Sequence, residues 1–330
     1  MAAIAAAAIT VAVLLMTAAS LRRNLFLYTN PLAEYGVQYP FAQNGTVPED
    51  IVMGGQTYTY NKDLVNVLFI GYDETVQREM PGIGFQADTL VLAVINKKTG
   101  GISVLSIPRD TVTDFPVFDF NGNYATVNSG QVALSHAYGR EYDISNDLTM
   151  ASVSNLLYQI PIGRYFALNI DGIGPVNDAA GGVNLELLAD FTAFNPEMSM
   201  GTMYTLWGDE AELYVRARQA PNMSGEDLDR MKLQKQYIAE FVRSLKTAAA
   251  EDFSVLGNVL QAAQGYSQSN LEIVELLYLA VRLRNASIEL ENMVTIPGHA
   301  EPGGQFDSVY ITDEEALKQM VLDVFFVPAA

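Results

Sequence analysis

Three apolar runs lie close together between residues 65 and 107. They are Val65–Ile70, Thr89–Ile95 and Ile102–Ile107, all rich in Val, Ile and Leu and bounded by Gly, Pro or Asp. Runs of this length between turn-forming residues predict buried strands. The second and third runs are joined by Lys97-Lys98-Thr99-Gly100, a short loop containing Gly, so we expect a β-hairpin.

Helical and extended patterns alternate along the rest of the chain. We expect helices over residues 128–138, 148–160, 173–180, 224–249, 255–263, 271–283 and 313–325, and strands over 165–170 and 293–296. Residues 211–217 resemble a strand or a helix end, and the alternation of apolar Leu213, Val215 and Ala217 with polar residues favours the extended structure. Ser224 and Asp227 form a box-like cap for the longest helix. This mixture predicts an α/β domain whose helices flank a central mixed β-sheet.

The N-terminal pattern differs from that of the domain. Ala2 to Leu21 is an apolar run without charge, and it ends at Arg22-Arg23. About 20 helical residues span the hydrocarbon core of a membrane. We therefore expect a membrane helix over residues 1–23, a linker or stalk over 24–62 and a domain over 63–330, with a signal peptide or a buried helix as alternatives. The positive-inside rule would place Arg22-Arg23 in the cytoplasm, so charge alone leaves the orientation open.

Composition narrows the class of function. The 330 residues are 49% hydrophobic, carry a formal net charge of −19 and include no cysteine. Such an acidic balance argues against nucleic acid as a partner, because phosphate backbones are bound by clustered Lys and Arg. A thiolate metal site is excluded. With two histidines far apart, a zinc site is not expected, and we expect His136 to be a packed side chain and His299 a loop residue.

Charged residues stand near an end of each of the first three strands. They are Asp73, Asp88, and Arg109 with Asp110. Carboxylates and an arginine at strand ends suit a metal–phosphate site, because Mg²⁺ takes hard oxygen ligands and Arg binds two phosphate oxygens at once. Taken singly, Asp73 and Asp88 are also consistent with turn residues or helix caps.

A second polar group follows about 100 residues later. Arg216 and Arg218 are two positions apart, so they would project from the same face of a strand. Asp227, Arg230 and Gln234 are three and four apart and share one helix face. The alternatives are a solvated strand face paired with neighbouring glutamates, and a merely polar helix face.

In this order, the residues resemble the LytR–CpsA–Psr family. The motifs are Gly71-Tyr72-Asp73, Ala87-Asp88-Thr89, Ser106-Ile107-Pro108-Arg109-Asp110-Thr111, His136-Ala137-Tyr138-Gly139, Ala179-Ala180-Gly181-Gly182-Val183, Tyr214-Val215-Arg216-Ala217-Arg218 and Asp227-(x)2-Arg230-(x)3-Gln234. They cover residues 63 to 327, and their combination is specific although each motif alone is weak. The resemblance implies an extracytoplasmic α/β domain on a single-pass cell-membrane helix. It also implies transfer of a glycopolymer phosphate from a polyprenyl-pyrophosphate carrier to peptidoglycan.

The resemblance implies a role for each site residue. Asp73 and Asp88 would hold Mg²⁺ (or Mn²⁺). The pyrophosphate would be contacted by Arg109, Arg216, Arg218, Arg230 and Gln234, with Asp227 ordering the arginines. Arg109 would also assist the transfer, and Asp110 or Asp73 is our candidate for accepting the proton of the acceptor hydroxyl. The lipid tail would lie in an apolar tunnel between sheet and helices, and the polymer would be a teichoic acid, a capsule or another wall glycan.

Three positions depart from the family pattern, each by the loss of a positive charge. Gln86 replaces an arginine, Thr126 lies where a lysine usually precedes the helix, and Leu233 replaces a basic residue. These losses motivate two alternatives at the same site. One is a regulatory protein that binds polyprenyl phosphates without turnover, and the other is a lipid pyrophosphatase that uses water as the acceptor.

Overall fold

The computed structural model describes residue 32 and residues 50–74, 85–119, 121–139, 144–217, 227–282, 293–304 and 308–329, with backbone only at 227, 228, 277 and 280–282. The expected membrane helix lies outside these ranges, as does most of the expected linker. Within the described part of the chain, no helix is both long and apolar enough to cross a bilayer.

A six-stranded mixed sheet forms the centre of the described structure, with the order β11-β8-β3-β4-β5-β12. Its strands are β3 (Leu64–Tyr72), β4 (Ala87–Asn96), β5 (Ile102–Ile107), β8 (Arg164–Asn169), β11 (Ser267–Ser269) and β12 (Met293–Thr295). β3, β4 and β5 pair in antiparallel fashion, while β8 is parallel to β3 and β12 is parallel to β5. The three predicted strands, their hairpin and the mixed α/β class are confirmed.

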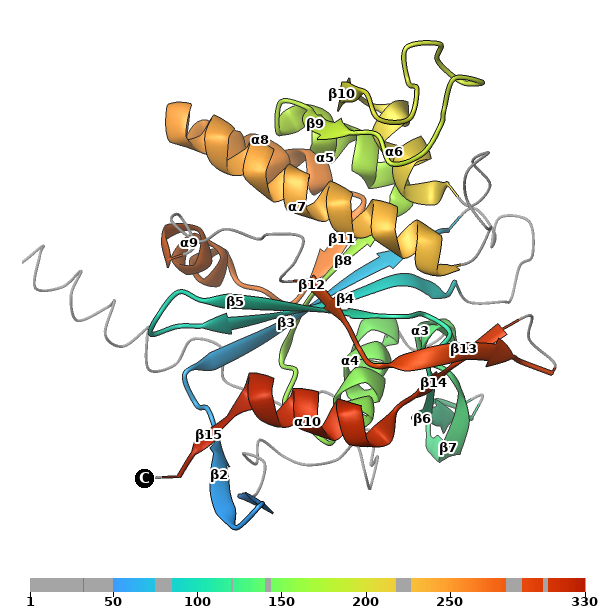
Figure 1. The fold of residues 1–330 in the computed structure, drawn as a ribbon, viewed down its shortest axis with the longest axis vertical. Coiled ribbons are helices and arrows are strands. Elements are labelled where there is room, and N and C mark those ends of the chain that lie inside the picture. Colours follow the sequence, from blue (N-terminus) through green and yellow to red (C-terminus); the bar gives the residue numbers. More distant parts are fainter. Residues whose placement is uncertain are drawn as a thin grey trace, which may run out of the picture.

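Helices cover both faces of this sheet (Figure 1). On one side lie α5 (Ile173–Ala179), α6 (Asp209–Arg216), α7 (Asp227–Glu251), α8 (Ser254–Ala263) and α9 (Ile273–Arg282). On the other side lie α3 (Val132–Tyr138), α4 (Ser145–Leu156) and α10 (Glu314–Phe325). The expected architecture of helices flanking a central sheet is thus observed.

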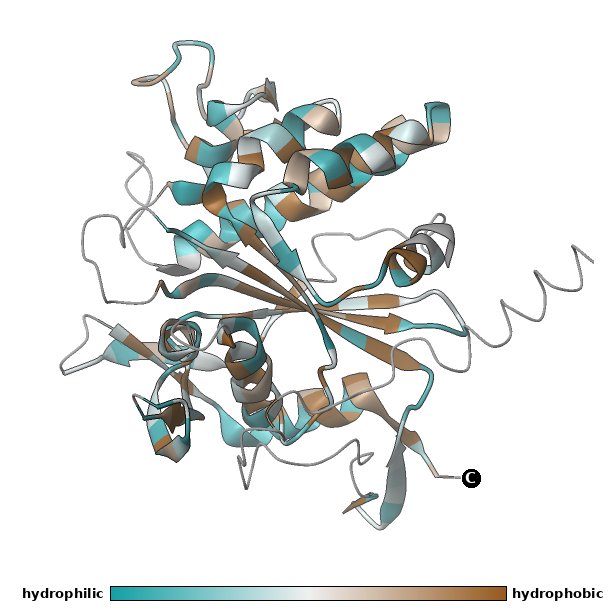
Figure 2. Ribbon diagram, turned by 180° about the vertical axis from the view of Figure 1, so that it is seen from behind, coloured by the Kyte–Doolittle hydropathy of each residue, from teal (hydrophilic) through white to brown (hydrophobic). Residues whose placement is uncertain are grey.

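The strands of the sheet are hydrophobic along most of their length, whereas the helices alternate apolar and polar positions (Figure 2). Leu68 and Ile70 pack toward α4 and α10. Val65 and Val67 project to the other face and pack against Leu279 of α9. A strand buried on both faces needs a continuous apolar run. This is why the apolar runs in the sequence predict these strands correctly.

Four smaller sheets surround this centre in the described residues. They are β1 (Ile51–Met53) with β2 (Gln56–Tyr60) and β15 (Phe326–Pro328), β6 (Val112–Phe118) with β7 (Tyr124–Gln131), β9 (Val183–Glu186) with β10 (Met203–Leu206), and β13 (Gly298–Pro302) with β14 (Ser308–Thr312). A 3₁₀ helix, η3 (Ile170–Gly172), follows β8. Because β2 pairs with β15, the last part of the expected linker is β-structure joined to the chain's final strand.

Three expectations need correction. His299 lies in strand β13 rather than in a loop. The sequence left residues 211–217 open between a strand and a helix end and favoured the strand, but residues 209–216 form helix α6, in which buried Ala211, Tyr214 and Val215 follow helical spacing. Acidic residues in its first turn also favour a helix N-terminus. Residues 128–131 belong to β7, so α3 begins only at Val132. The other helices end within about four residues of the predicted ranges, and the expected cap at Ser224 lies outside the described residues.

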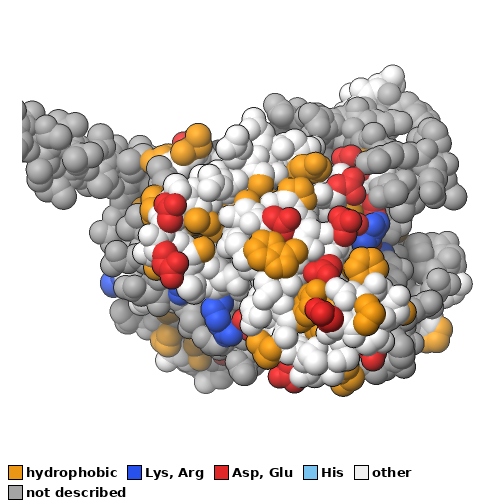
Figure 3. Space-filling model, turned by 90° about the horizontal axis from the view of Figure 1, so that it is seen from above, with side chains coloured by type: hydrophobic (Ala, Val, Ile, Leu, Met, Phe, Trp, Pro, Cys, Tyr) orange, Lys and Arg blue, Asp and Glu red, His pale blue; other side chains and the backbone are white. Residues whose placement is uncertain are grey.

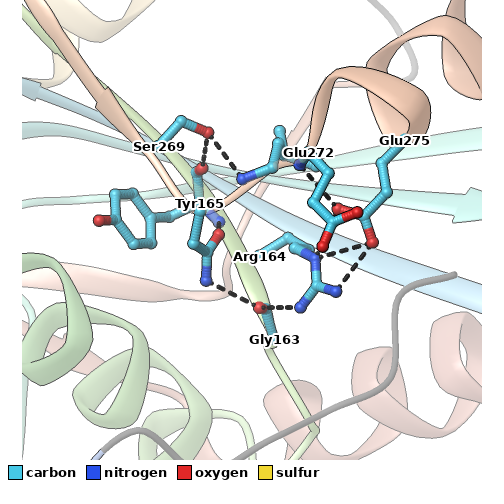
Figure 4. Close-up of polar contacts among 8 residues, drawn as sticks. Gly163, Arg164, Tyr165, Ser269, Glu272 and Glu275 are labelled. Atoms are coloured by element: carbon cyan, nitrogen blue, oxygen red, sulfur yellow. Dashed lines mark hydrogen bonds and ion pairs between the residues drawn. The ribbon is translucent and has the colours of Figure 1, made fainter.

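An ion pair fastens α9 to β8 (Figure 4). Arg164 Nε donates to Glu275 Oε2 at 2.9 Å, and Arg164 Nη2 donates to Glu275 Oε1 at 2.8 Å, so the contact is forked. Glu275, which is 1% exposed, also accepts a hydrogen bond from the backbone N of Glu272 at 3.1 Å. This carboxylate therefore caps α9 and joins it to the sheet.

Candidate metal and anion site

A β-bulge sets the position of Asp88. The register passes from the pair Gly71–Thr89 to the pair Tyr72–Ala87, which leaves Asp88 as the extra residue on β4. A bulge bends its strand and redirects a side chain. Because β3 and β4 are adjacent and antiparallel, the residue that follows β3 lies at the same end of the sheet as Asp88. That residue is Asp73, as the sequence led us to expect.

Three stacked rings hold this end of β3 and β4. The ring of Tyr72 lies 5.1 Å from that of Phe85 and 5.3 Å from that of His136, centroid to centroid. His136 is buried, with Nδ1 2.9 Å from the Phe85 carbonyl oxygen and Nε2 3.3 Å from Asn146 Oδ1. Burial lowers the pKa of His136 and favours the neutral imidazole. The prediction that His136 is a packed side chain is confirmed.

Gly139 allows α3 and α4 to approach each other. A Cβ atom at this position would lie 2.4 Å from both Cα and N of Ser145, closer than atoms can pack. The ring of Tyr138 packs 5.5 Å from that of Phe115 on β6. The tyrosine–glycine pair therefore has a packing role, and it positions the helix that carries His136.

Arg109 lies in the tight turn after β5, and its backbone is held by neighbouring elements. The backbone N of Ala133 donates to the Arg109 carbonyl at 3.0 Å, and that of Tyr310 donates to the Asp110 carbonyl at 2.8 Å. Arg109 Nη1 lies 2.5 Å from Asp88 Oδ1. The turn thus places a guanidinium against the carboxylate of the bulge.

Asp110 contacts Arg109 from the same turn. It is 7% exposed, and its Oδ1 accepts a hydrogen bond from Gln131 Nε2 at 2.8 Å. The same Oδ1 lies 3.6 Å from Arg109 Nε. Gln131 also donates to the Ser308 carbonyl at 2.8 Å. Gln131 was not singled out in the sequence, because a glutamine in a short hairpin carries no pattern that marks a partner far away in the chain.

Arg216 connects the helical layer to the sheet. It occupies the last turn of α6 and forms an ion pair with Asp73. Arg216 Nη1 also lies 2.7 Å from Glu212 Oε1, one helical turn away. The contact with Glu212 matches the alternative interpretation of this arginine, while the contact with Asp73 joins it to the predicted site. Arg218 lies outside the described residues.

One pocket brings the two halves of the site together. Its lining residues come from β4, the end of β5 with its turn, and α7: Asp88, Thr89, Leu90, Ser106, Ile107, Arg109, Arg230, Met231 and Gln234. Its empty volume, open mouth included, is about 240 Å³. Gln234 Nε2 also donates to the Val215 carbonyl of α6 at 3.3 Å.

Four of the predicted residues, Asp88, Arg109, Arg230 and Gln234, therefore meet in one place. The pair of Asp73 and Arg216 is not part of the lining. Asp227 begins α7, and its side chain is not described. Thr89 and Ser106 also line the pocket; they were not predicted as site residues, although both stand within the quoted motifs.

The donor set fits Mg²⁺ or Mn²⁺. Such ions are commonly held by one or two carboxylates, with water and substrate phosphates completing the coordination, and Asp73 with Asp88 would supply those carboxylates. Among the described residues there is no group of three or more His, Asp and Glu that could enclose an ion. A metal held here would therefore share its coordination with an anionic ligand.

The fold and the pocket define an α/β protein with an acidic and arginine-lined site at one end of its central sheet. The family described as "LytR_cpsA_psr family" matches residues 41–323, and the chain belongs to this family. The resemblance seen in the motifs is confirmed.

Relatives and solved structures support the same assignment. The polyisoprenyl-teichoic acid–peptidoglycan teichoic acid transferase TagU of Bacillus mycoides (strain KBAB4) is 27% identical over 234 residues, which are 71% of this chain and 69% of that protein. TagU of Halalkalibacterium halodurans is 28% identical over 233 residues, 70% of this chain and 69% of that protein. The crystal structure of B. subtilis TagV superposes with a TM-score of 0.61 at 22% identity, over 80% of this chain and 97% of that one. TagT bound to LIIa-WTA gives 0.58 at 20% identity, over 80% and 90%. These structures show a shared fold.

Proposed function

We propose that this protein is a transferase that moves a glycopolymer phosphate from a polyprenyl-pyrophosphate carrier to peptidoglycan in cell-wall assembly. The observation that carries the proposal is the pocket in which Arg109, Arg230 and Gln234 face Asp88. Membership of the family and the names of the TagU relatives support it.

The proposed chemistry needs a pocket that stabilises negative charge. A hydroxyl oxygen of the acceptor sugar would attack the phosphorus next to the polymer, and the bond to the bridging oxygen would break. Polyprenyl phosphate would leave with the bonding electrons. Arg109 and Arg230 would bind the phosphate oxygens on which charge develops. Asp73 and Asp88 would hold Mg²⁺, which would supply positive charge to offset part of the pyrophosphate charge.

The proton of the attacking hydroxyl needs an acceptor, and we propose Asp110. It lies beside Arg109, and its Oδ1 accepts a hydrogen bond from Gln131, which fixes the position of the carboxylate. Asp73, which is paired with Arg216, remains the second candidate.

An apolar passage for the lipid tail is supported by Phe69. This residue lies in β3, in the middle of the sheet, on the face that α7 and α9 cover, yet it is 42% exposed. Its ring stands 6.2 Å from that of Phe166 on β8. The described helices therefore leave apolar surface uncovered where a polyprenyl chain would lie.

Transfer of a labelled polymer from its lipid carrier to peptidoglycan tests the proposal. We expect Arg109→Ala to reduce transfer by at least about 100-fold, since it removes a fixed donor to the developing charge. Arg243→Ala is the control, because Arg243 lies exposed on α7 and pairs with Glu240. Transfer by Arg109→Ala at the rate of the control would refute the mechanism.

The same assay separates the alternatives at this site. Bound lipid without cleavage would indicate a binding protein, and cleavage without attachment to peptidoglycan would indicate a pyrophosphatase. One of the three charge losses that motivate these alternatives is at Leu233. Leu233 is 2% exposed and packs in the apolar cluster around α6, so this position argues less strongly for them. Thr126 is exposed on β7, whereas Gln86 directly precedes the strand that carries Asp88.

We also propose that the domain is extracytoplasmic and anchored in the cell membrane. The support is the apolar run over residues 2–21 together with the acceptor, which lies outside the membrane. Digestion of the domain by protease added to intact wall-stripped cells, with a cytoplasmic protein spared, is the expected result.

A further inference from the structure

Lys235 of α7 is a half-buried cation whose contacts are to uncharged groups. Its Nζ donates to the Met293 carbonyl at 3.0 Å and to Thr295 Oγ1 at 2.5 Å, both on β12. In the described part of the chain, no carboxylate lies within ion-pair distance of it. Burial lowers the pKa of Lys235. Lys232 on the same helix is exposed, and its Nζ lies 2.7 Å from Asp229 Oδ1. The two lysines therefore differ in both burial and partner.

The position of Lys235 adjoins the pocket. Met231, four residues earlier and on the same helix face, lines the pocket. Thr295 pairs in register with Ser106, a residue that also lines the pocket. Neighbouring strands lie about 4.8 Å apart, so the ammonium stands roughly one strand beyond the pocket wall. An ammonium has three donors, and two are used here, which leaves one for a ligand.

The order of strands places Lys235 on the side of the pocket opposite to the exposed apolar surface. Phe69 and Phe166 mark the apolar surface over β3 and β8, the pocket lies over β4 and β5, and Lys235 lies over β12. A carrier whose tail lies over β3 and β8 and whose pyrophosphate lies in the pocket would extend its polymer toward β12.

We propose that Lys235, with the hydroxyls of Thr295 and Ser106, forms a further phosphate-binding subsite on the polymer side of the pocket. Its ligand is an additional phosphate group of the anion whose first phosphates contact Arg109 and Arg230. The inference rests on the proposed function in one respect only, namely that the pocket binds a pyrophosphate. A lysine suits this place because it is a point charge on a flexible stem that can reach past Thr295.

Inorganic pyrophosphate and inorganic tripolyphosphate are the probes, titrated calorimetrically into the full-length protein with Mg²⁺ present at a fixed free concentration. We expect wild type to bind tripolyphosphate more tightly than pyrophosphate. Lys235→Gln should weaken tripolyphosphate binding about tenfold and pyrophosphate binding by less than twofold. Lys235→Arg should stay within about twofold of wild type, and Lys232→Gln, the matched control, should bind both anions normally.

Melting temperature without ligand detects a purely structural role. A lower melting temperature in Lys235→Gln with unchanged discrimination between the two anions would overturn the subsite, and so would equal weakening of both. Thr295→Val, which keeps the shape of the side chain, should reproduce part of the tripolyphosphate loss. Failure of the proposed function is distinct, because it would leave pyrophosphate binding unaffected by Arg109→Ala.

Discussion

His136 shows how one buried side chain ties the site to the stability of the protein. It stacks on Tyr72, and its ring nitrogens face the carbonyl oxygens of Phe85 and Asn146. Phe85 opens the segment that leads through Gln86 to Asp88. The ring therefore holds the start of β4 against the end of β3, where both predicted metal ligands stand.

Stability should fall as the pH drops below about 6.5. Burial lowers the pKa of His136 below its ordinary value of 6.5, so between these two pKa values the unfolded chain binds a proton that the folded protein does not. Stability therefore rises with pH in this window, by at most about 1.4 kcal/mol per unit. Urea unfolding between pH 7.5 and 5.5 should show a shallower slope for His136→Gln.

The control for this experiment is His299→Gln, which removes an exposed histidine beside Glu301. It should keep the wild-type slope. Carboxylates titrate in all three proteins, so only the difference between slopes is informative. Parallel slopes for wild type and His136→Gln would contradict the assignment of the pH dependence to this residue.

At the scale of elements, the sequence was informative where burial imposes a pattern. The sequence predicts β3, β4 and β5 because helices cover both of their faces, and such strands need continuous apolar runs. The segment of α6 stayed open between a strand and a helix end, because seven residues fit period two and period 3.6 nearly equally. The small sheets of β6 with β7 and β9 with β10 were not predicted, because β6 and β7 mix apolar and polar residues without a clear period and β9 and β10 have only four residues each. The bulge at Asp88 was not predicted, because it depends on how β3 and β4 pair, and the sequence of one strand does not specify this register.

The attachment of α9 to β8 depends on one buried carboxylate. Glu275→Gln should destabilise the protein by about 2–3 kcal/mol, because it removes the charge of Glu275 from beside the largely buried Arg164 guanidinium. Urea unfolding gives the free energy, and amide hydrogen exchange in α9 should show the largest local loss of protection.

Glu240→Gln is the matched control on the same side of the sheet. Glu240 pairs with exposed Arg243, so its loss should change stability by less than about 1 kcal/mol. Replacing Arg164 and Glu275 together by Met should recover part of the loss, since an apolar pair needs no counter-charge. A Glu275→Gln protein as stable as the control would show that the ion pair contributes nothing to holding α9.

At the scale of the whole molecule, charge is unevenly distributed. The chain carries a net charge of −19. The face seen from above shows scattered acidic and apolar side chains with few basic ones (Figure 3). Against this background, Arg109 and Arg230 in one pocket are a local exception, and Arg216 stands beside Asp73. Such a site attracts an anion only at short range, since the field of the remaining surface opposes it.

If Asp73 and Asp88 hold a metal, their ion pairs with Arg216 and Arg109 would couple metal binding to anion binding. Each candidate metal ligand is neutralised by an arginine that would contact the pyrophosphate. A metal must therefore compete with the arginines, and an anion that draws the arginines away frees the carboxylates. We expect pyrophosphate to tighten Mn²⁺ binding, and Mn²⁺ to tighten pyrophosphate binding, by the same factor of about 5 to 150.

Calorimetric titration with Mn²⁺, with and without pyrophosphate and corrected for the complex the two form in solution, measures this factor. Arg216→Gln supplies the sharper test, because it leaves Asp73 without this partner. Mn²⁺ alone should then bind more tightly than to wild type, while the gain from pyrophosphate shrinks. Arg243→Ala should change neither value. If Arg216→Gln binds Mn²⁺ more weakly, or keeps the full coupling, the arginine does not compete with the metal and the two halves of the site act independently.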